Sequence, residues 1–451
     1  MPNLRITFPE QAKNHFNGQA DQFLLLLKPE PQKIAPDRPP MSSDHRPIDH
    51  TITENEMRGP TMTGTIDGFG TQTSKFFQTE KGPIGIVEPD FQSLERFIEL
   101  ISQRAEVRPY LTPQYIMEIV FVWFEQRYKG LIPQSQGFVE YLCNKSEKDV
   151  GIRRVGIPIS YFVIQEAFSV GNATFDFYSK TFFDEIELTF KEKNPNANKD
   201  DLKRFRKKYQ GIVFANLTVC GEPEKCMDVA IEETEKALMI LRFLSPTAVL
   251  PQIPSYVGRM GYTHVPISNY FVFEDKFPII HEQVDEKADF TLTIGSDQLK
   301  MMKTAGLDLL SQLIIKDNPN DLEKLLLNSI SLFAKGIGLR DERDKLVFCL
   351  ASIETLLLKN SSEPIQHSVG LRLAFITAQS LQDRKKILSL VRHAYELRSS
   401  YLHHGKKRTD ILVLTELQQT IFSGLRAVLY RCSKFSNQTQ LIEYIEDIIL
   451  T

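Results

Sequence analysis

The chain has 451 residues, a length typical of two or three domains, and its 42% hydrophobic and 25% charged residues are typical of a globular protein. This composition excludes a collagen-like repeat, a coiled coil or disorder for most of the chain. No fully apolar run reaches the roughly 20 residues that a membrane-spanning helix needs, and the N-terminal sequence is not that of a signal peptide. We therefore expect a cytoplasmic protein that does not bind a membrane. The formal net charge of the chain is −3 at pH 7.

The cysteines predict free thiols rather than disulfides or a metal centre. All 5 are scattered along the chain without a C-x-x-C pair, which in a reducing compartment indicates unpaired and mostly buried side chains. Cys220 and Cys226 are close in sequence, but no second pair or nearby histidine completes a zinc site. We expect no bound metal and no other cofactor.

Residues 1–300 predict a mixed α/β domain. Short strands are expected at 4–7 and 22–27, and prolines indicate an irregular stretch at 28–70, with an edge strand as the alternative for part of it. From Asp90 the apolar spacing becomes helical, and Thr112-Pro113 is typical of the start of a second helix. Further strands are expected at 158–178, 211–221, 270–273 and 290–294, and a long helix at 223–244.

A dense basic run lies within a charged stretch at 191–209. Aromatic residues alternate with the basic ones, as in surfaces that bind nucleic acids. Nearby acidic residues favour the alternative, an ordinary solvated helix face. The basic residues are Lys203, Arg204, Arg206, Lys207 and Lys208, the aromatic ones Phe205 and Tyr209, and the acidic ones Glu192, Asp200 and Asp201.

Residues 301–451 predict an all-α domain, so we expect the fold class to be α+β with a boundary near residue 300. This part of the chain has more basic than acidic side chains, which is a mild indication of an anionic partner. The expected helices cover 297–316, 320–336, 340–359, 364–379, 382–403, 409–432 and 440–449.

The segment 390–408 (LVRHAYELRSSYLHHGKKR) covers the expected end of one of these helices and the residues that follow it. The helix is expected to begin after Ser380, with Asp383 as its capping partner, and to end before Gly405. Arg398, His403 and His404 then lie in its last turn and a half. The basic residues Lys406, Lys407 and Arg408 follow directly after it.

An arginine and a histidine placed together can cleave RNA without a metal. The histidine exchanges a proton near neutral pH and can activate the ribose 2′-OH, while the guanidinium stabilises the charge on phosphorus. Basic residues also concentrate at helix C-termini because they complement the helix dipole, which stabilises by ~0.3–1 kcal/mol each. The spacing alone leaves both interpretations open.

This segment resembles the HEPN family, and in particular its Apea-like branch, whose hallmark is an R-x4-6-H motif at the end of a helix. The matching residues are Tyr395, Arg398-Ser399 and His403-His404-Gly405. Upstream, 344–358 and 370–376 resemble two further family segments and place Glu354 and Arg372 at their charged positions. The resemblance covers about 310–435 and implies an all-α bundle.

The resemblance implies a metal-independent endoribonuclease that acts as a homodimer through its C-terminal domain. Such proteins are often toxins or antiphage, abortive-infection effectors, so a phage or host protein or a ligand is the expected trigger at residues 1–300. Some members are not catalytic, and the alternative is therefore a dimerisation or nucleic-acid-binding module beside a sensing domain.

The resemblance also implies roles for individual residues. Arg398 and His403 are the expected catalytic pair, with His404 as the alternative base because R-x4-H and R-x5-H both fit the motif. The residues expected to contact RNA are Ser399, Lys406, Lys407 and Arg408, and the supporting residues are Glu354, Arg372 and Tyr395.

Overall fold

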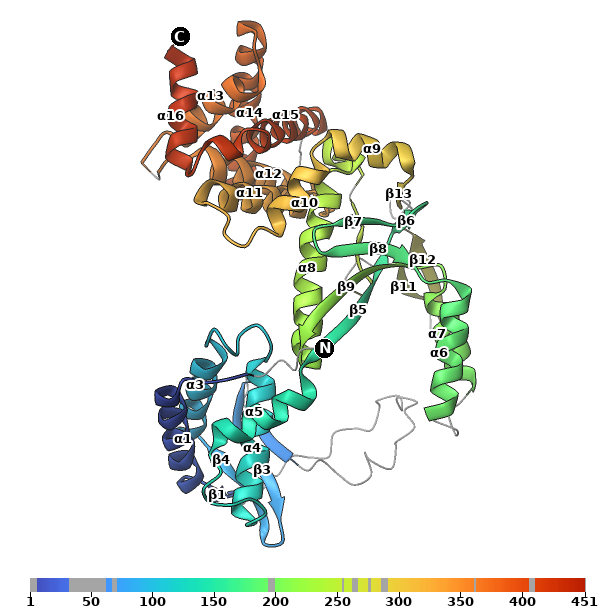
Figure 1. Cartoon of the computed structure of the whole chain (residues 1–451). Coiled ribbons are helices and arrows are strands. Elements are labelled where there is room, and N and C mark those ends of the chain that lie inside the picture. The colour runs from blue at the N-terminus through green and yellow to red at the C-terminus, as the bar shows by residue number, and fades with distance from the viewer. Residues whose placement is uncertain are drawn as a thin grey trace. The chain divides into compact units, whose positions relative to one another are not determined.

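The computed structural model shows a mixed α/β protein with a helical C-terminal region (Figure 1). Two compact units are present: the first consists of Met1–Arg153 and Thr218–Asp228, the second of Arg154–Leu217 and Val229–Thr451. The structure describes residues 6–31, 62–66, 71–193, 199–253, 255–261, 267–274, 277–284, 291–360, 362–404 and 410–450.

The first unit contains a four-stranded antiparallel sheet and a set of helices around one aromatic-rich core. Phe91, Trp123 and Phe124 in this core are fully buried. The strand order is β1 (Lys28–Pro29), β4 (Gly82–Val87), β3 (Gln72–Thr79) and β2 (Met62–Ile66), and the helices are α1 (Glu10–Leu25), α3 (Asp90–Ser102), α4 (Pro113–Tyr128) and α5 (Phe138–Asp149).

The predicted starts of α3 and α4 are confirmed. In α3 the apolar residues at helical spacing, including Phe91 and Leu94, are buried. The Thr112 hydroxyl accepts a hydrogen bond from the Tyr115 backbone N–H at 3.1 Å, and Pro113 is the first helical residue of α4. Side-chain capping and a proline at the first position together fix where this helix begins.

The predicted strand at 22–27 is wrong, because α1 continues through Leu25. Its apolar run is too short to reveal a period, and burial of Phe16 and Ala20 on one helical face determines the structure instead. Leu25 is 84% exposed, so the run does not form a buried strand. Residues 4 and 5 of the other expected strand lie outside the described residues.

Glu222 ties the segment 218–228 to the first unit. Its side chain is buried and accepts hydrogen bonds from the Thr112 hydroxyl at 2.8 Å and the Thr112 N–H at 3.2 Å. The same carboxylate accepts from the backbone N–H groups of Glu224 and Lys225, in the first turn of α8 (Pro223–Phe243). One carboxylate therefore satisfies backbone donors at the start of two helices.

The second unit holds most of a five-stranded sheet, which includes strands predicted within 158–178 and at 211–221. The strand predicted at 290–294 is β13 (Leu292–Ile294), which pairs in parallel with β6 (Phe162–Ile164). The strand predicted at 270–273 is β11 (Ile267–Glu274), and it pairs with β12 (Phe277–Val284), a strand that the sequence did not predict. The sheet order is β10 (Gly258–Arg259), β5 (Gly151–Ser160), β9 (Val213–Gly221), β8 (Ala173–Phe177) and β7 (Phe168–Val170). The charged stretch forms α6 (Lys180–Lys193) and α7 (Lys199–Tyr209).

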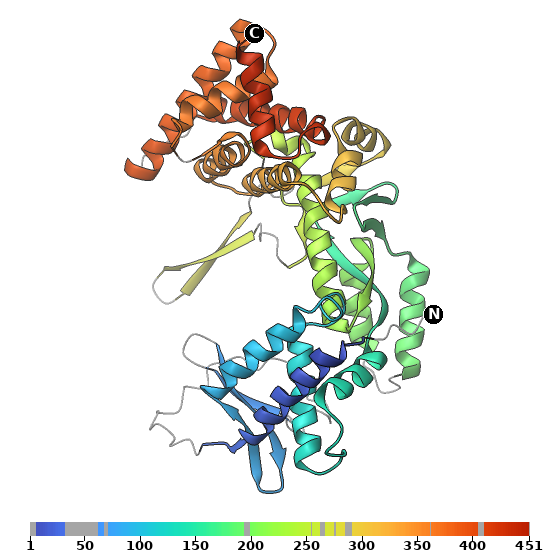
Figure 2. The same cartoon turned by 60° about the vertical axis from the view of Figure 1, so that its left-hand side comes forward.

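The rest of the second unit is a helical bundle (Figure 2). Each helix expected after residue 297 is present, although 297–316 forms two helices separated at Gly306, whose φ of +113° favours glycine. The sequence-based boundary near residue 300 lies inside this unit, where the strands give way to helices. The helices are α9 (Ser296–Thr304), α10 (Leu307–Ile314), α11 (Asp321–Ile337), α12 (Glu342–Leu357), α13 (Ile365–Thr377), α14 (Leu381–His404), α15 (Ile411–Leu429) and α16 (Gln438–Leu450).

Two further sequence predictions concern the whole chain. The five cysteines are free, and Cys226, Cys349 and Cys432 are buried, as expected. Among the described residues, no helix has both the length and the apolar character required to cross a membrane.

Candidate functional site

Helix α14 carries the R-x4-H motif and begins as the sequence predicts. The Ser380 hydroxyl accepts a hydrogen bond from the Asp383 backbone N–H at 3.1 Å and donates one to the Asp383 carboxylate at 2.7 Å. Val391 and Ala394 are fully buried against the bundle. The helix remains regular through His404, so the motif lies on a rigid element rather than on a loop.

Arg398 is held by a carboxylate from the neighbouring helix α12. Its Nη1 atom lies 2.6 Å from Oε1 of Glu354, and the Tyr395 hydroxyl donates to the same oxygen at 2.9 Å. The guanidinium is 6.0 Å from the centre of the Tyr395 ring. Three residues that the sequence placed on two separate helices therefore form one cluster, Glu354–Tyr395–Arg398.

The cluster leaves part of the Arg398 guanidinium accessible. The Arg398 side chain is 28% exposed, and its Nε and Nη2 atoms make no hydrogen bond to the residues that the structure describes. A guanidinium has five N–H donors, so a single carboxylate oxygen can orient it without occupying them all. The remaining edge can donate to a phosphate.

Tyr395 acts in this cluster as a neutral hydrogen-bond donor. Burial raises the pKa of its phenol, and the negative charge of Glu354 raises that pKa further. The hydroxyl therefore keeps its proton at neutral pH and is not a candidate for the general base.

A second contact holds the end of α14, two residues before His403. The Tyr401 hydroxyl donates to Asp344 in the first turn of α12 at 3.1 Å, and the Arg343 guanidinium lies 4.9 Å from the Tyr401 ring. The hydrogen bond from Arg343 lowers the pKa of Asp341 to about 2, so this capping carboxylate is ionised at neutral pH. The C-terminal end of α14 thus lies beside the acidic start of α12.

The other residues predicted for the site are only partly described. His403 and His404 are the last residues of α14, but their side chains lie outside the described part of the chain. Lys406, Lys407 and Arg408, like Gly405, also lie outside it. Ser399 is exposed next to Arg398.

Arg372 does not join the Glu354–Tyr395–Arg398 cluster. It is buried and donates to the Leu357 carbonyl at 2.8 Å and to both Glu363 oxygens at 2.7 and 3.0 Å. A further hydrogen bond of 2.8 Å reaches Glu446 on α16. Arg372 therefore links the C-terminal end of α12 to α13 and α16.

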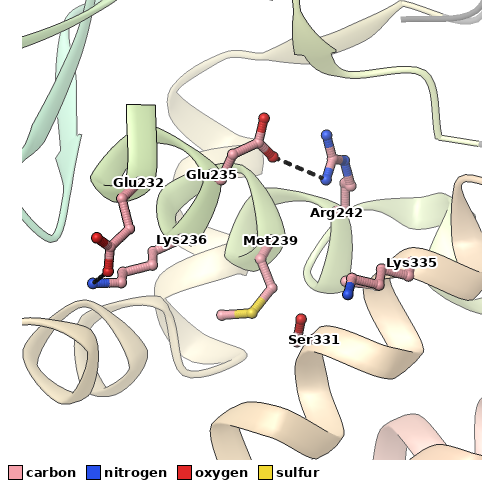
Figure 3. Close-up of a pocket in the computed structure, with 8 residues that line it drawn as sticks. Glu232, Glu235, Lys236, Met239, Arg242, Ser331 and Lys335 are labelled. Carbon is pink, nitrogen blue, oxygen red and sulfur yellow. Dashed lines mark ion pairs between the residues drawn. The ribbon is translucent and has the colours of Figure 1, made fainter. Parts of the chain in front are cut away.

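A groove that the sequence reasoning missed lies between α8 and α11 and has a volume of about 250 Å³ (Figure 3). Most of its charged groups pair with one another: Lys236 with Glu232 at 2.8 Å, and Glu235 with Arg242 at 3.8 Å. Helical spacing could have placed these α8 residues on one face, but only the structure shows that Lys335 faces them.

Among the described residues, no group of three His, Cys, Asp or Glu is placed to hold a metal ion.

The strongest candidate site is thus the Glu354–Tyr395–Arg398 cluster at the packed surfaces of α12 and α14. Comparisons of the chain with models of protein families, with curated proteins and with solved structures found no match.

Proposed function

We propose that the helical region of this protein is a metal-independent endoribonuclease with its active site on the last turns of α14. One observation carries the proposal: Glu354 and Tyr395 hold the Arg398 guanidinium in place while two of its nitrogens remain without a partner among the described residues. A donor oriented before the substrate arrives stabilises transition-state charge without a reorganisation cost. A surface arginine that only improved solubility would not need such support.

In the proposed reaction the ribose 2′-oxygen attacks phosphorus and the bond to the 5′-oxygen breaks. His403 accepts the proton of the 2′-OH, and Arg398 stabilises the extra negative charge on the phosphoryl oxygens. A second, protonated group donates a proton to the leaving 5′-oxygen. The products carry a 2′,3′-cyclic phosphate and a free 5′-OH. Ser399, Lys406, Lys407 and Arg408 bind neighbouring phosphates.

A homodimer supplies the second acid in this proposal. One motif offers a base and an electrophile, so a two-fold copy of α14 can bring the missing donor into the same cleft. The rest of the chain restrains the activity until a phage or host protein or a ligand binds, as in an antiphage or toxin effector. If light scattering shows a monomer and this monomer cleaves RNA at the full rate, the dimer is contradicted.

A second candidate function is a non-catalytic module for dimerisation or nucleic-acid binding. It is favoured by the ion pair itself, because Glu354 neutralises the Arg398 charge and fastens α14 to α12 at 2.6 Å. In this case the pair stabilises the bundle and has no role in chemistry.

An RNA-cleavage assay in EDTA separates the two functions. The wild type should cleave single-stranded RNA and leave 2′,3′-cyclic phosphate ends, and Arg398→Ala should not. Arg392→Ala is the matched control, because Arg392 is an exposed arginine on the same helix. Activity that EDTA abolishes and Mg²⁺ restores, or equal loss in both variants, would contradict the ribonuclease proposal.

A further inference from the structure

Helix α7, in the strand-containing part of the second unit, has one aromatic face and one basic face. The aromatic face packs inward: the ring of Phe205 lies 6.1 Å from that of Phe183, and the ring of Tyr209 lies 6.2 Å from that of Phe214. Since these contacts fix the rotation of the helix about its axis, the opposite face points to solvent.

Arg206 anchors α7 and differs from the other basic residues. Its Nη1 atom lies 2.7 Å from Oδ1 of Asp184 and 3.5 Å from Oε1 of Glu187, both on α6. These ion pairs occupy Arg206, so it belongs to the support of the helix rather than to its outer surface.

The outer face is formed by four exposed basic residues in two rows. Lys203 and Lys207 form one row, and Arg204 and Lys208 form the other, each at a spacing of four residues, or about 6 Å along the helix. Lys203 contacts Asp200 at 3.3 Å, in a pair whose two side chains are largely exposed. Neither Lys207 nor Lys208 has a carboxylate partner among the residues that the structure describes.

Helix stability accounts for only part of this face. The helix dipole favours the basic residues Lys207 and Lys208 in the last turn, and the ion pair with Asp200 stabilises Lys203 one turn earlier. Like charges four residues apart destabilise a helix. The arrangement is therefore better explained by an anionic partner.

The aromatic residues decide which kind of partner fits. A membrane-binding helix must insert its apolar face into the lipid, but the apolar face of α7 packs against Phe183 and Phe214. Phe205 remains 41% exposed at the edge of the basic face. Basic residues beside an exposed aromatic ring are typical of sites where phosphates are neutralised and an unpaired base stacks.

We infer that α7 is a binding surface for single-stranded RNA, separate from the catalytic residues. The phosphates contact Lys203, Arg204, Lys207 and Lys208, and a base stacks on Phe205. The choice of RNA over DNA rests on the proposed function, whereas the binding of a single-stranded nucleic acid does not.

The test compares the full-length wild type with Lys207→Ala/Lys208→Ala. The control is Lys300→Ala/Lys303→Ala, which removes two exposed lysines from α9 and changes the net charge equally. Fluorescence anisotropy in EDTA measures binding of a labelled single-stranded RNA with 2′-O-methyl groups, which cannot be cleaved by 2′-OH attack. Thermal unfolding checks that both variants are folded.

We expect the α7 variant to bind about tenfold more weakly, while the α9 variant binds like the wild type. The slope of log K against log salt should fall by about 1.4, because each lost contact to a single strand removes about 0.7. Equal weakening in both variants, or no weakening in the α7 variant, would overturn the inference. Anionic vesicles that bind the wild type but not the α7 variant would also overturn it.

Two further arms separate this inference from the proposed function. Tighter binding to single-stranded DNA than to RNA would overturn the choice of RNA. RNA binding that depends on α7, without any cleavage of unmodified RNA, would support α7 and contradict the ribonuclease. Cleavage of unmodified RNA, together with RNA binding that does not depend on α7, would support the ribonuclease and contradict the inference about α7.

Discussion

The surroundings of Arg372 and Arg398 differ although both arginines belong to the same helical bundle. The Arg372 side chain is 7% exposed, and four hydrogen bonds connect it to Leu357, Glu363 and Glu446. The Arg398 side chain is 28% exposed and, among the described residues, hydrogen-bonds only to Glu354.

This difference separates a structural arginine from one that can bind a ligand. A buried guanidinium must satisfy its donors within the protein, because an unpaired buried charge is costly. A partly exposed guanidinium held at one nitrogen keeps donors for a phosphate. We therefore expect changes at Arg372 to affect mainly stability and changes around Arg398 to affect mainly RNA cleavage.

The largest effect is expected at the histidine that works with Arg398. On the regular helix α14, His403 and His404 are rotated from Arg398 by about 140° and about 240°. The two positions are therefore about 100° apart around the helix axis, and we expect one of them, not both, to work with Arg398. His403→Ala should lower the cleavage rate by ~10²–10⁴, the range for general acid–base catalysis, and His404→Ala should lower it far less. A larger loss at His404 would assign the base to His404.

Arg372→Ala is expected to destabilise the protein by about 3 kcal/mol, because it leaves Glu363 without its buried partner. Urea unfolding measures this change, with Arg392→Ala as the exposed control. At temperatures where the variant is folded, its cleavage rate should stay near that of the wild type. A variant as stable as the wild type but unable to cleave RNA would reverse the roles of the two arginines.

Tyr395→Phe tests the support of Arg398. The change removes one hydrogen bond to the Glu354 carboxylate and should lower the free energy of unfolding by about 1–2 kcal/mol. The cleavage rate should fall less than in Arg398→Ala, since Glu354 still contacts the guanidinium. Cleavage by Tyr395→Phe as weak as that of Arg398→Ala would show that the tyrosine takes part directly.

The smallest effect is the pH dependence of the Arg372 cluster. The hydrogen bonds from Arg372 lower the pKa of Glu363, so the folded state favours its ionised form. This stability is present above the pKa of about 4.3 expected in the unfolded chain and is lost as pH falls through the lower folded pKa. The difference in unfolding free energy between wild type and Arg372→Ala should therefore shrink below about pH 4. A difference that grows in acid would contradict this origin.

Local patterns predicted the bundle well, because its helices carry clear apolar periods and caps. The start of α14 follows from Ser380 and Asp383, which hydrogen-bond as expected. The strand predicted at 22–27 was wrong because this short apolar stretch shows no period. Burial of Phe16 on one face favours a helix instead. The return of 218–228 to the first unit depends on Glu222 and Thr112, a long-range contact that no local pattern encodes.

The candidate site was predictable only in part. The resemblance to HEPN proteins named Glu354, Arg372, Tyr395 and Arg398, but it did not distinguish their roles. The hydrogen-bond donors of Arg372 are occupied by Glu363 and by Glu446 on helix α16, and these contacts depend on tertiary packing. The groove between α8 and α11 and the aromatic support of α7 depend on packing in the same way.

The different roles of Arg398 and Arg372 are best tested by recording RNA cleavage in EDTA together with urea unfolding for Arg398→Ala and Arg372→Ala. Arg398→Ala should lose ~10²–10³ in cleavage rate, as expected for a donor to the transition state, and about 1–2 kcal/mol in stability, less than Arg372→Ala. Arg372→Ala should show the opposite pattern. If Arg398→Ala cleaves RNA like the wild type, or if neither the wild type nor any variant cleaves RNA, the account of Arg398 as a catalytic residue is contradicted.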